Sequence, residues 1–363
     1  MIDRNTRHKW GLIFTTAALA TTYHSAANAA NAAGVNESAV AKSISDAVSA
    51  SGSITKDSAG GAVSGDPALA TAPDAPIEAL PSSVSSRGFL RNGGRLLLTG
   101  GVSTIEGAGG GGLASWALIG SYATRDEIGV SAFGTGVFTQ DFSLRSYGAS
   151  VGLYNRVELS IAHQNFDLRQ VGASLGLGPH YLINQTIIGA KVRVVGDAVV
   201  DQDKWLPQIS VGAQYKINEN PLVVGTVLGV KRKSVDFYVA ASKLFLADNL
   251  LVNTTLRLTK ANQYGILGFG GLGGKDQDYK AQFEGSVAYL LTRKLAIGGE
   301  VRTKSNRLEG ALGGTTFKEQ TAYDAFVAYA PSRNFSFTLA YVDLGQIALR
   351  GQRGVYLSTQ VGF

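Results

Sequence analysis

The sequence predicts an all-β protein: a closed antiparallel up-and-down transmembrane β-barrel of about 14 strands (12–16), preceded by a signal peptide and a flexible leader. Three observations predict this fold. An export signal stands at the N-terminus, apolar and polar residues alternate along many segments after Phe89, and short turns alternate with long loops between those segments. Alternation with period two is typical of strands that have one apolar and one polar face.

Residues 1–32 have the pattern of a secretory signal peptide. Arg4, Arg7 and Lys9 precede an apolar stretch over 10–20, and small residues in A-x-A order follow at 27–29 and 30–32. The apolar stretch is shorter than the roughly 20 residues of a transmembrane helix. We expect cleavage near residue 29 or 32 and localisation in the outer membrane of a Gram-negative bacterium.

Residues 33–88 are rich in Ala, Ser and Gly and contain no aromatic residue. Such a composition buries too little apolar surface to offset the entropy of ordering the chain. We therefore predict a disordered leader over 33–88, which would serve as a plug or as a partner-binding arm, and a transmembrane barrel over 89–363.

The composition excludes several kinds of site. Charged residues make up 17% of the chain, against about 25% in soluble domains. The absence of cysteine excludes disulfides, thiolate metal sites and cysteine nucleophiles. The net charge of +6 comes without a clustered basic stripe of interleaved aromatics, so no nucleic-acid partner is expected.

The alternation defines the individual elements in order along the chain. The segment 182–196, for example, carries Ile188 and Val192 on one face and Lys191 and Arg193 on the other. The predicted strands lie near 94–101, 112–122, 127–136, 142–154, 156–165, 182–196, 206–217, 234–246, 250–260, 279–291, 294–304, 321–330, 335–345 and 354–363.

Two long connections leave alternatives open. The stretch "PLVVGTVLGV" at 221–230 is apolar enough for a strand, but the up-and-down parity of the barrel favours a loop. The Gly-rich connection 261–278 either stays outside the barrel or folds inward as a constriction.

Both a soluble sandwich and a membrane barrel give every strand an apolar and a polar face, and the sequence favours the membrane. The export signal leads out of the cytoplasm, and charged residues occupy the polar face well inside the strands. Tyr279 and Tyr289 stand ten residues apart on one apolar face, a span of about 25 Å, which is the height of a lipid-facing band.

The predicted barrel interior supplies the candidate pore-lining residues. These are Glu158, Lys191, Arg193, Lys216, Asp236, Arg257, Lys280, Glu284, Glu300, Arg302, Lys304 and Asp324. The set holds seven basic and five acidic residues, which predicts at most a mild preference for anions.

The chain ends in "GVYLSTQVGF", in which Val355, Leu357, Val361 and Phe363 share the apolar face. This ending resembles the C-terminal signature of bacterial outer-membrane barrels, with Thr359 as the weak position. The resemblance implies recognition by the barrel-assembly machinery and contact with outer-membrane lipid.

Three further segments resemble an uncharacterised proteobacterial outer-membrane family, a domain of unknown function. They are "GGVSTIEGAGGGGLASWALIGSYATRDEIGVSAFGT", "LLTRKLAIGGEVRTK" and "AYVDLGQIA". The resemblance extends over most of residues 95–363. It supports the fold and implies no activity.

The sequence offers little catalytic chemistry. Two G-x-G-x-x-G matches, beginning at Gly107 and Gly268, fall in loops of a chain with 46 glycines, where chance matches are expected. Neither a cofactor nor a metal is expected. His163 lies on an outward face, as in barrels that hydrolyse lipid with a His-Ser pair, but Asn165 stands where that pair would place its serine.

Three functions follow from these observations. The first is a porin-like channel or transporter for small polar solutes, which would not be an enzyme. The second is a structural or envelope-assembly barrel with a plugged lumen and a partner-binding leader. The third, a minor alternative, is a lipid-modifying outer-membrane enzyme centred on His163.

Overall fold

The computed structural model describes residues 101–363, except 122–124, 126, 200, 202–204 and 312. The signal peptide and leader predicted over 1–88, and most of the strand predicted over 94–101, lie outside the described residues. No helix among the described residues is long and apolar enough to cross a membrane.

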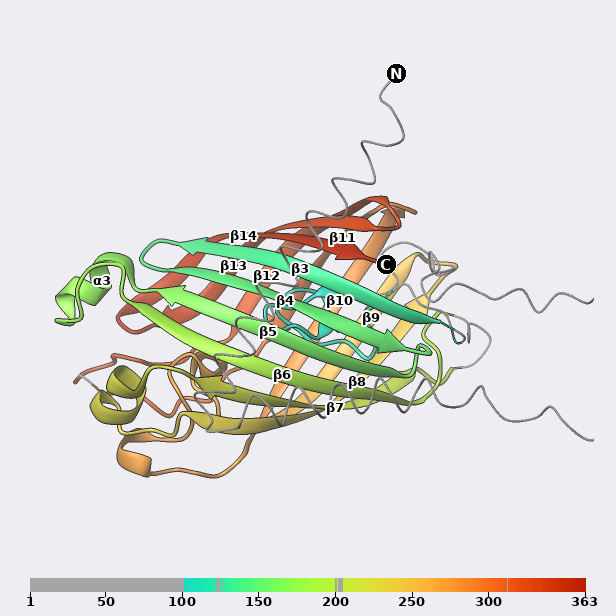
Figure 1. Cartoon of the computed structure of the whole chain (residues 1–363). Helices are drawn as coiled ribbons and strands as arrows, with labels where there is room; N and C mark the ends of the chain where they lie inside the picture. Colours follow the sequence, from blue (N-terminus) through green and yellow to red (C-terminus); the bar gives the residue numbers. More distant parts are fainter. Residues whose placement is uncertain (1–100, 122–124, 126, 200, 202–204, 312) are drawn as a thin grey trace, which may run out of the picture. The chain divides into compact units, whose positions relative to one another are not determined.

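Twelve antiparallel strands close into a barrel (Figure 1). They are β3 (Ile128–Thr139), β4 (Ser143–Leu153), β5 (Val157–Asp167), β6 (Leu182–Val195), β7 (Gln208–Asn218), β8 (Lys233–Phe245), β9 (Leu250–Thr259), β10 (Lys280–Thr292), β11 (Leu295–Arg302), β12 (Ala322–Ser332), β13 (Phe335–Ile347) and β14 (Arg350–Gly362). Each strand pairs with its neighbours in sequence, and β14 pairs with β3 to close the sheet.

The predicted closed antiparallel β-barrel is confirmed, and its 12 strands stand at the lower limit of the predicted range of 12–16, two fewer than the expected 14. The prediction over 112–122 is wrong, because residues 112–121 do not join the barrel wall. Leu113, Trp116 and Leu118 are all buried. A wall strand must present one apolar face to lipid, whereas this segment is covered on all sides.

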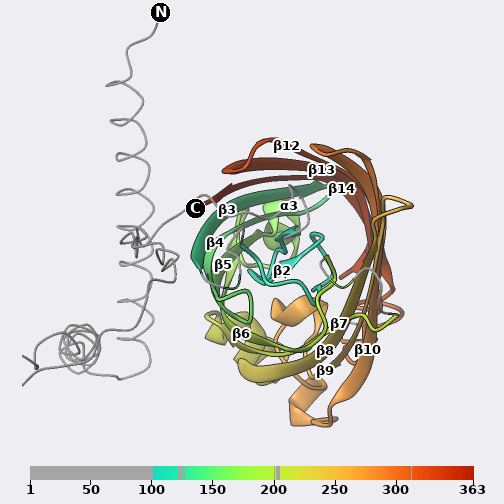
Figure 2. The same cartoon turned by 90° about the vertical axis from the view of Figure 1, so that its right-hand side faces the viewer.

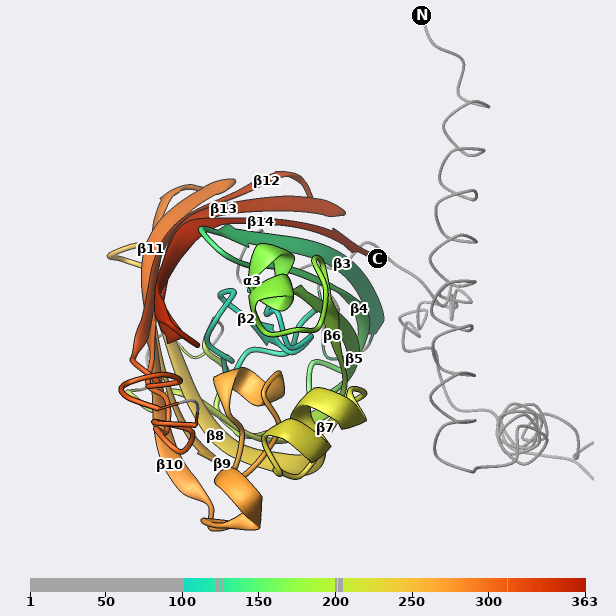
Figure 3. The same ribbon diagram turned by 90° about the vertical axis from the view of Figure 1, so that its left-hand side faces the viewer.

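Residues 101–121, here called the lumen segment, lie inside the barrel. Figure 2 and Figure 3 look along the barrel from its two ends and show this segment, in blue-green, within the ring of strands. It contains a small hairpin of β1 (Val102–Ser103) and β2 (Gly109–Gly110), and every residue of it is buried.

The two ends of the barrel differ in their connections. At the short-turn end, turns such as 154–156 and 293–294 join the strands, and Phe363 lies there beside Val130. Among the described residues, short helical segments gather at the long-loop end (Figure 3). They are α3 (Arg169–Ser174), η1 (Pro221–Val227), η2 (Gln263–Gly265) and η3 (Leu272–Gly274).

The helical turn η1 decides between the two alternatives for 221–230, because this stretch forms no barrel strand.

The outward face of the strands is apolar, as predicted: Leu159, Ile188 and Leu256 are each about half exposed. Tyr279 and Tyr289 also point outward. This is the surface that a barrel presents to the lipid of a membrane.

Candidate channel lumen

Three glutamates on the barrel wall hold the backbone of the lumen segment. Glu158 accepts hydrogen bonds from the amides of Gly109 (3.0 Å) and Gly120 (2.6 Å). Glu300 accepts one from Leu113 (2.7 Å), and Glu284 accepts one from Ser115 (2.8 Å). An irregular segment has few backbone partners of its own, so side chains of the wall must satisfy its buried amides.

Other wall side chains bind the carbonyl groups of the lumen segment. Lys191 donates to the carbonyls of Gly109 (3.0 Å) and Leu118 (2.8 Å), and also to Oε2 of Glu158 (2.9 Å). Gln208 and Ser210 both donate to the carbonyl of Ala117. Polar residues of β4 to β11 and of β14 thus bind the lumen segment by hydrogen bonds.

Glu106 is the only charged residue of the lumen segment and lies at the centre of a buried ionic cluster. It pairs with Lys216, with Arg302 (3.0 Å) and with Arg257 (3.7 Å). Asp236 lies 2.8 Å from Lys216 and 3.6 Å from Arg257. Glu284 completes the cluster by pairing with both arginines, which gives three cations and three carboxylates.

The connection 261–278, left open by the sequence, enters the barrel from the long-loop end. Residues 261–271 are buried. The carbonyl of Tyr264 accepts from Lys216 (3.2 Å) and Gln185 (3.3 Å), and the ring of Tyr264 lies 4.3 Å from the guanidinium of Arg302. This inward loop covers the ionic cluster on the side of the long loops.

Glu319 and Lys304 lie at the edge of the inward loop and meet at Gln263. Glu319 accepts from the amide of Gln263 (3.1 Å), while Lys304 donates to its Oε1 (2.8 Å). Burial raises the pKa of Glu319 to about 7, although Lys304 opposes this shift. Burial lowers the pKa of Lys304 to about 8, and Glu319 opposes that shift in turn.

The structure divides the candidate pore-lining residues into two groups. Eight are buried and face the interior: Glu158, Lys191, Lys216, Asp236, Arg257, Glu284, Glu300 and Arg302. Arg193 pairs with Asp197 at the short-turn end (2.6 Å), and Asp324 lies opposite Glu300 in the register. Lys280 is half exposed at the long-loop end and pairs with Asp276 (3.4 Å), and Lys304 lies at the edge of the inward loop, where it donates to Gln263. The role of all twelve candidates as pore-lining residues stays a prediction.

The sequence analysis missed Glu106, because residues 102–111 fall in the Gly-rich connection between the strands predicted over 94–101 and 112–122. One signal was present, since a single charged residue stands in the otherwise uncharged stretch 101–121.

The C-terminal residues Val355, Leu357 and Phe363 point outward and are each more than 40% exposed, and Val361 is half-buried on the same face. Their recognition by the assembly machinery stays a prediction.

His163 lies on the outward face, as predicted, and contacts polar groups there. Its Nδ1 is 2.9 Å from Oγ1 of Thr186, which is its register partner on β6, and its Nε2 is 3.2 Å from Nδ2 of Asn165. Thr186 also donates to Glu219 (2.6 Å). The neighbouring strand therefore supplies the hydroxyl that is missing from the sequence around His163.

The model of a protein family, described as "Protein of unknown function (DUF3034)", matches residues 99–360. The chain belongs to DUF3034. The match includes the lumen segment and almost the whole barrel, and it confirms the expected membership of an uncharacterised outer-membrane family. No curated protein matches the chain.

Solved structures similar to this DUF3034 barrel include three outer-membrane proteins. "KdgM porin" is 13% identical, with 64% of this chain and 99% of that chain covered and a TM-score of 0.41. A NanC porin is 11% identical, with coverages of 64% and 98% and a TM-score of 0.43. Outer membrane phospholipase A from Escherichia coli is 10% identical, with coverages of 64% and 89% and a TM-score of 0.35. At these identities the similarity does not extend to activity.

Proposed function

We propose that this protein is an outer-membrane channel that is held closed by its own lumen segment, and that it passes small polar solutes when that segment moves. The observation that supports this proposal is the way in which the segment is bound. Wall carboxylates and amides hold it through hydrogen bonds and ion pairs. Water and solute can replace such partners, so the polar wall would remain satisfied in an open barrel.

The charges of the interior bear on selectivity. The positive and negative charges of the central cluster are equal in number. Outside the cluster, Lys191 forms an ion pair with Glu158. We therefore keep the expectation of at most a mild anion preference. The protein would lie in the outer membrane of a Gram-negative bacterium after cleavage near residue 29 or 32, and barrel-assembly machinery would insert it.

Planar-bilayer conductance of the mature protein tests the proposal. The variant Glu106→Gln removes the charge that joins the lumen segment to Lys216, Arg257 and Arg302. We expect it to increase the open probability at least tenfold. Glu309→Gln is the matched control, because Glu309 is an exposed loop residue whose partners Asn306 and Lys318 (4.0 Å) do not belong to the lumen segment.

The alternative of a structural barrel predicts a different result. Glu106→Gln would then remain silent, as would a protein that lacks the leader 33–88, although both retain a heat-modifiable barrel. That outcome would overturn the channel and favour an envelope role in which the leader binds a partner.

A second candidate function is lipid hydrolysis on the outward face. The observation that favours it is the contact of His163 with the hydroxyl of Thr186 on one side and with Asn165 on the other. A nucleophile, a base and a group that orients the base are the parts of a hydrolase. The hydrogen bond from Thr186 to Glu219 opposes this function, because it directs the hydroxyl proton away from His163.

Release of fatty acid from phospholipid vesicles by the purified barrel tests the second candidate. Unchanged release by both His163→Ala and Thr186→Val would exclude a role of this pair.

A further inference from the structure

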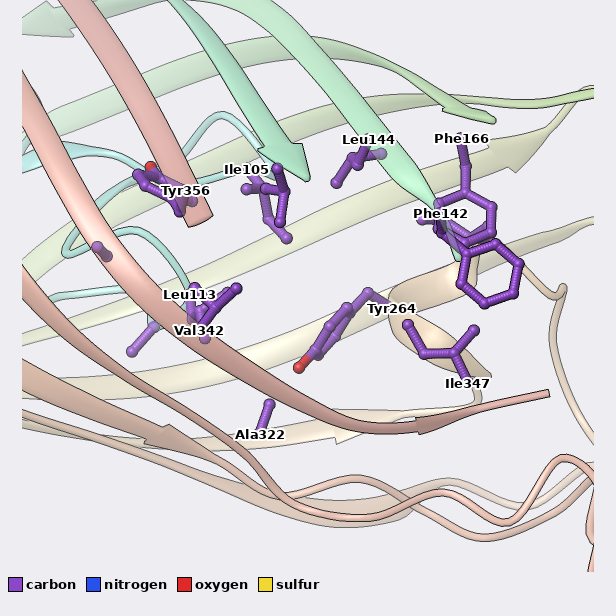
Figure 4. Packing of buried hydrophobic residues seen from close by; sticks show 14 of the residues in the cluster. Ile105, Leu113, Phe142, Leu144, Phe166, Tyr264, Ala322, Val342, Ile347 and Tyr356 are labelled. Atoms are coloured by element: carbon purple, nitrogen blue, oxygen red, sulfur yellow. The ribbon is translucent and has the colours of Figure 1, made fainter. Parts of the chain in front are cut away.

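An apolar cavity of about 130 Å³ lies at the long-loop end of the barrel. Its walls come from segments far apart in the sequence, among them Phe142, Phe166, Ile183, Val223, Leu267 and Ile347. Every residue that lines it is apolar. Figure 4 shows Phe142, Phe166 and Ile347 gathered at one end of the buried hydrophobic cluster.

The size and lining of this cavity fit a small apolar ligand. Protein interiors are packed with few voids larger than a water molecule, so an empty space of this size is unusual. An engineered cavity of about 150 Å³, lined by Leu, Ile and Phe, stays dry and binds benzene. The present cavity therefore has room for one six-membered ring or for an alkyl group of a few carbons.

The cavity borders the outside of the barrel. Leu175 and Val227 line it and are 38% and 59% exposed. Both belong to short helical segments of the long loops and not to the barrel wall: Leu175 follows α3, and Val227 ends η1. These two exposed side chains mark the side of the cavity from which a ligand would enter.

Apolar side chains continue from this cavity toward the lumen segment. A second, smaller cavity of about 30 Å³ shares Phe166, Leu267 and Ile347 with the first. The smaller cavity is lined on its inner side by Ile105 and Leu113. Ile105 precedes Glu106, and Leu113 donates its amide to Glu300, so the apolar path ends at residues that hold the segment in place.

We propose that the cavity between α3, η1 and the strand ends is a binding site for a small uncharged apolar molecule, either a single aromatic ring or a short alkyl group. A charged ligand is excluded by the lining, which offers no polar side chain to replace its hydration. The site goes beyond the proposed channel and does not depend on it, because binding requires no conduction.

Ligand-observed fluorine NMR with fluorobenzene tests the site, with the full barrel protein in lipid nanodiscs. We expect saturable line broadening that excess unlabelled toluene reverses. Val223→Phe fills the cavity and should weaken binding at least tenfold. Leu222→Phe is the matched control, because Leu222 lies on the same helical turn but is 52% exposed and does not line the cavity.

A second variant guards against misfolding of Val223→Phe. Leu175→Gln places an amide in the lining of the cavity, at a position that is partly exposed. We expect it to weaken binding about tenfold while the barrel stays folded. Absence of saturable broadening in the native protein, or unchanged binding in both cavity variants, would overturn the proposal. Displacement by laurate as effective as that by toluene would identify a lipid acyl chain as the occupant and would overturn the assignment to a small molecule.

Discussion

Glu106 and Arg302 form a bidentate ion pair inside the barrel, with Nη1 of Arg302 3.0 Å from Oε2 of Glu106 and Nη2 3.2 Å from Oε1. Glu106 belongs to the lumen segment and Arg302 ends β11, so this pair joins the contents of the barrel to its wall. Both side chains are at most 1% exposed. Loss of one partner leaves the other charge buried and only partly compensated.

A double-mutant cycle measures the coupling of this pair. We expect Glu106→Gln and Arg302→Gln each to lower the free energy of unfolding by about 3–5 kcal/mol, because each leaves unbalanced buried charge. The double variant should lose clearly less than the sum of the two, since it removes both charges. Urea unfolding of the refolded barrel gives all three values, and additive losses would contradict the pairing.

Gly110→Ala should loosen the lumen segment. A Cβ at this position would lie 2.1 Å from the carbonyl oxygen of Ala114 and 2.5 Å from Cγ2 of Thr104, so the hairpin must shift. Overpacking of this kind costs about 1–3 kcal/mol of stability. We expect faster cleavage of the segment by added protease.

Gly351→Ala is the control for this substitution. A Cβ at Gly351 meets no heavy atom within 4 Å, and its φ lies outside the left-handed region. Equal protease resistance of the native protein and of Gly110→Ala would contradict tight packing of the lumen segment.

Glu319 should make stability fall as the pH rises. Burial raises its pKa from an ordinary value near 4.5 to about 7. Between pH 4.5 and pH 7 the folded barrel therefore binds more protons than the unfolded chain. The stabilisation is complete below about pH 4.5 and is lost as the pH rises through about 7. We expect a decline of about 1 kcal/mol per pH unit over this window.

Thermal melts between pH 4.5 and 8 check this dependence. Glu319→Gln should remove most of the slope, because an amide can still accept the hydrogen bond of the Gln263 amide but does not titrate. Glu309→Gln, an exposed glutamate in the same connection, should leave the slope unchanged. Lys304 and Arg307 are the cations that lower the pKa of Glu319, so replacement of Lys304 by Met should raise that pKa and extend the decline of stability to higher pH.

The sequence predicted the barrel wall well, because each wall strand has one apolar and one polar face and so produces period two. The limits of β6 and β9 agree with the prediction to within one residue. The same rule failed for 112–122, where the alternation of small and apolar residues reflects burial within the lumen. Glu106 was missed for a related reason, since its partners Lys216 and Arg302 lie on distant strands and only the closed barrel brings them together.

The candidate pore-lining lysines Lys191 and Lys280 should respond very differently to the same substitution. Lys191 is buried and holds Glu158 together with two carbonyls of the lumen segment. Lys191→Met would leave the carboxylate of Glu158 without its cation, at a cost of about 3–5 kcal/mol. Lys280 is half exposed and pairs with a half-exposed Asp276, so Lys280→Met should change stability by less than about 1 kcal/mol.

Urea unfolding and bilayer conductance of the two variants separate a structural from a conductive role. For Lys191→Met we expect lower stability together with more frequent openings, because the lumen segment loses two hydrogen bonds and Glu158 loses its cation. Lys280→Met should keep native stability and change only the reversal potential in a salt gradient, toward cations, since it removes one positive charge at the mouth. Equal stability of the two variants would show that Lys191 does not hold the lumen segment in place.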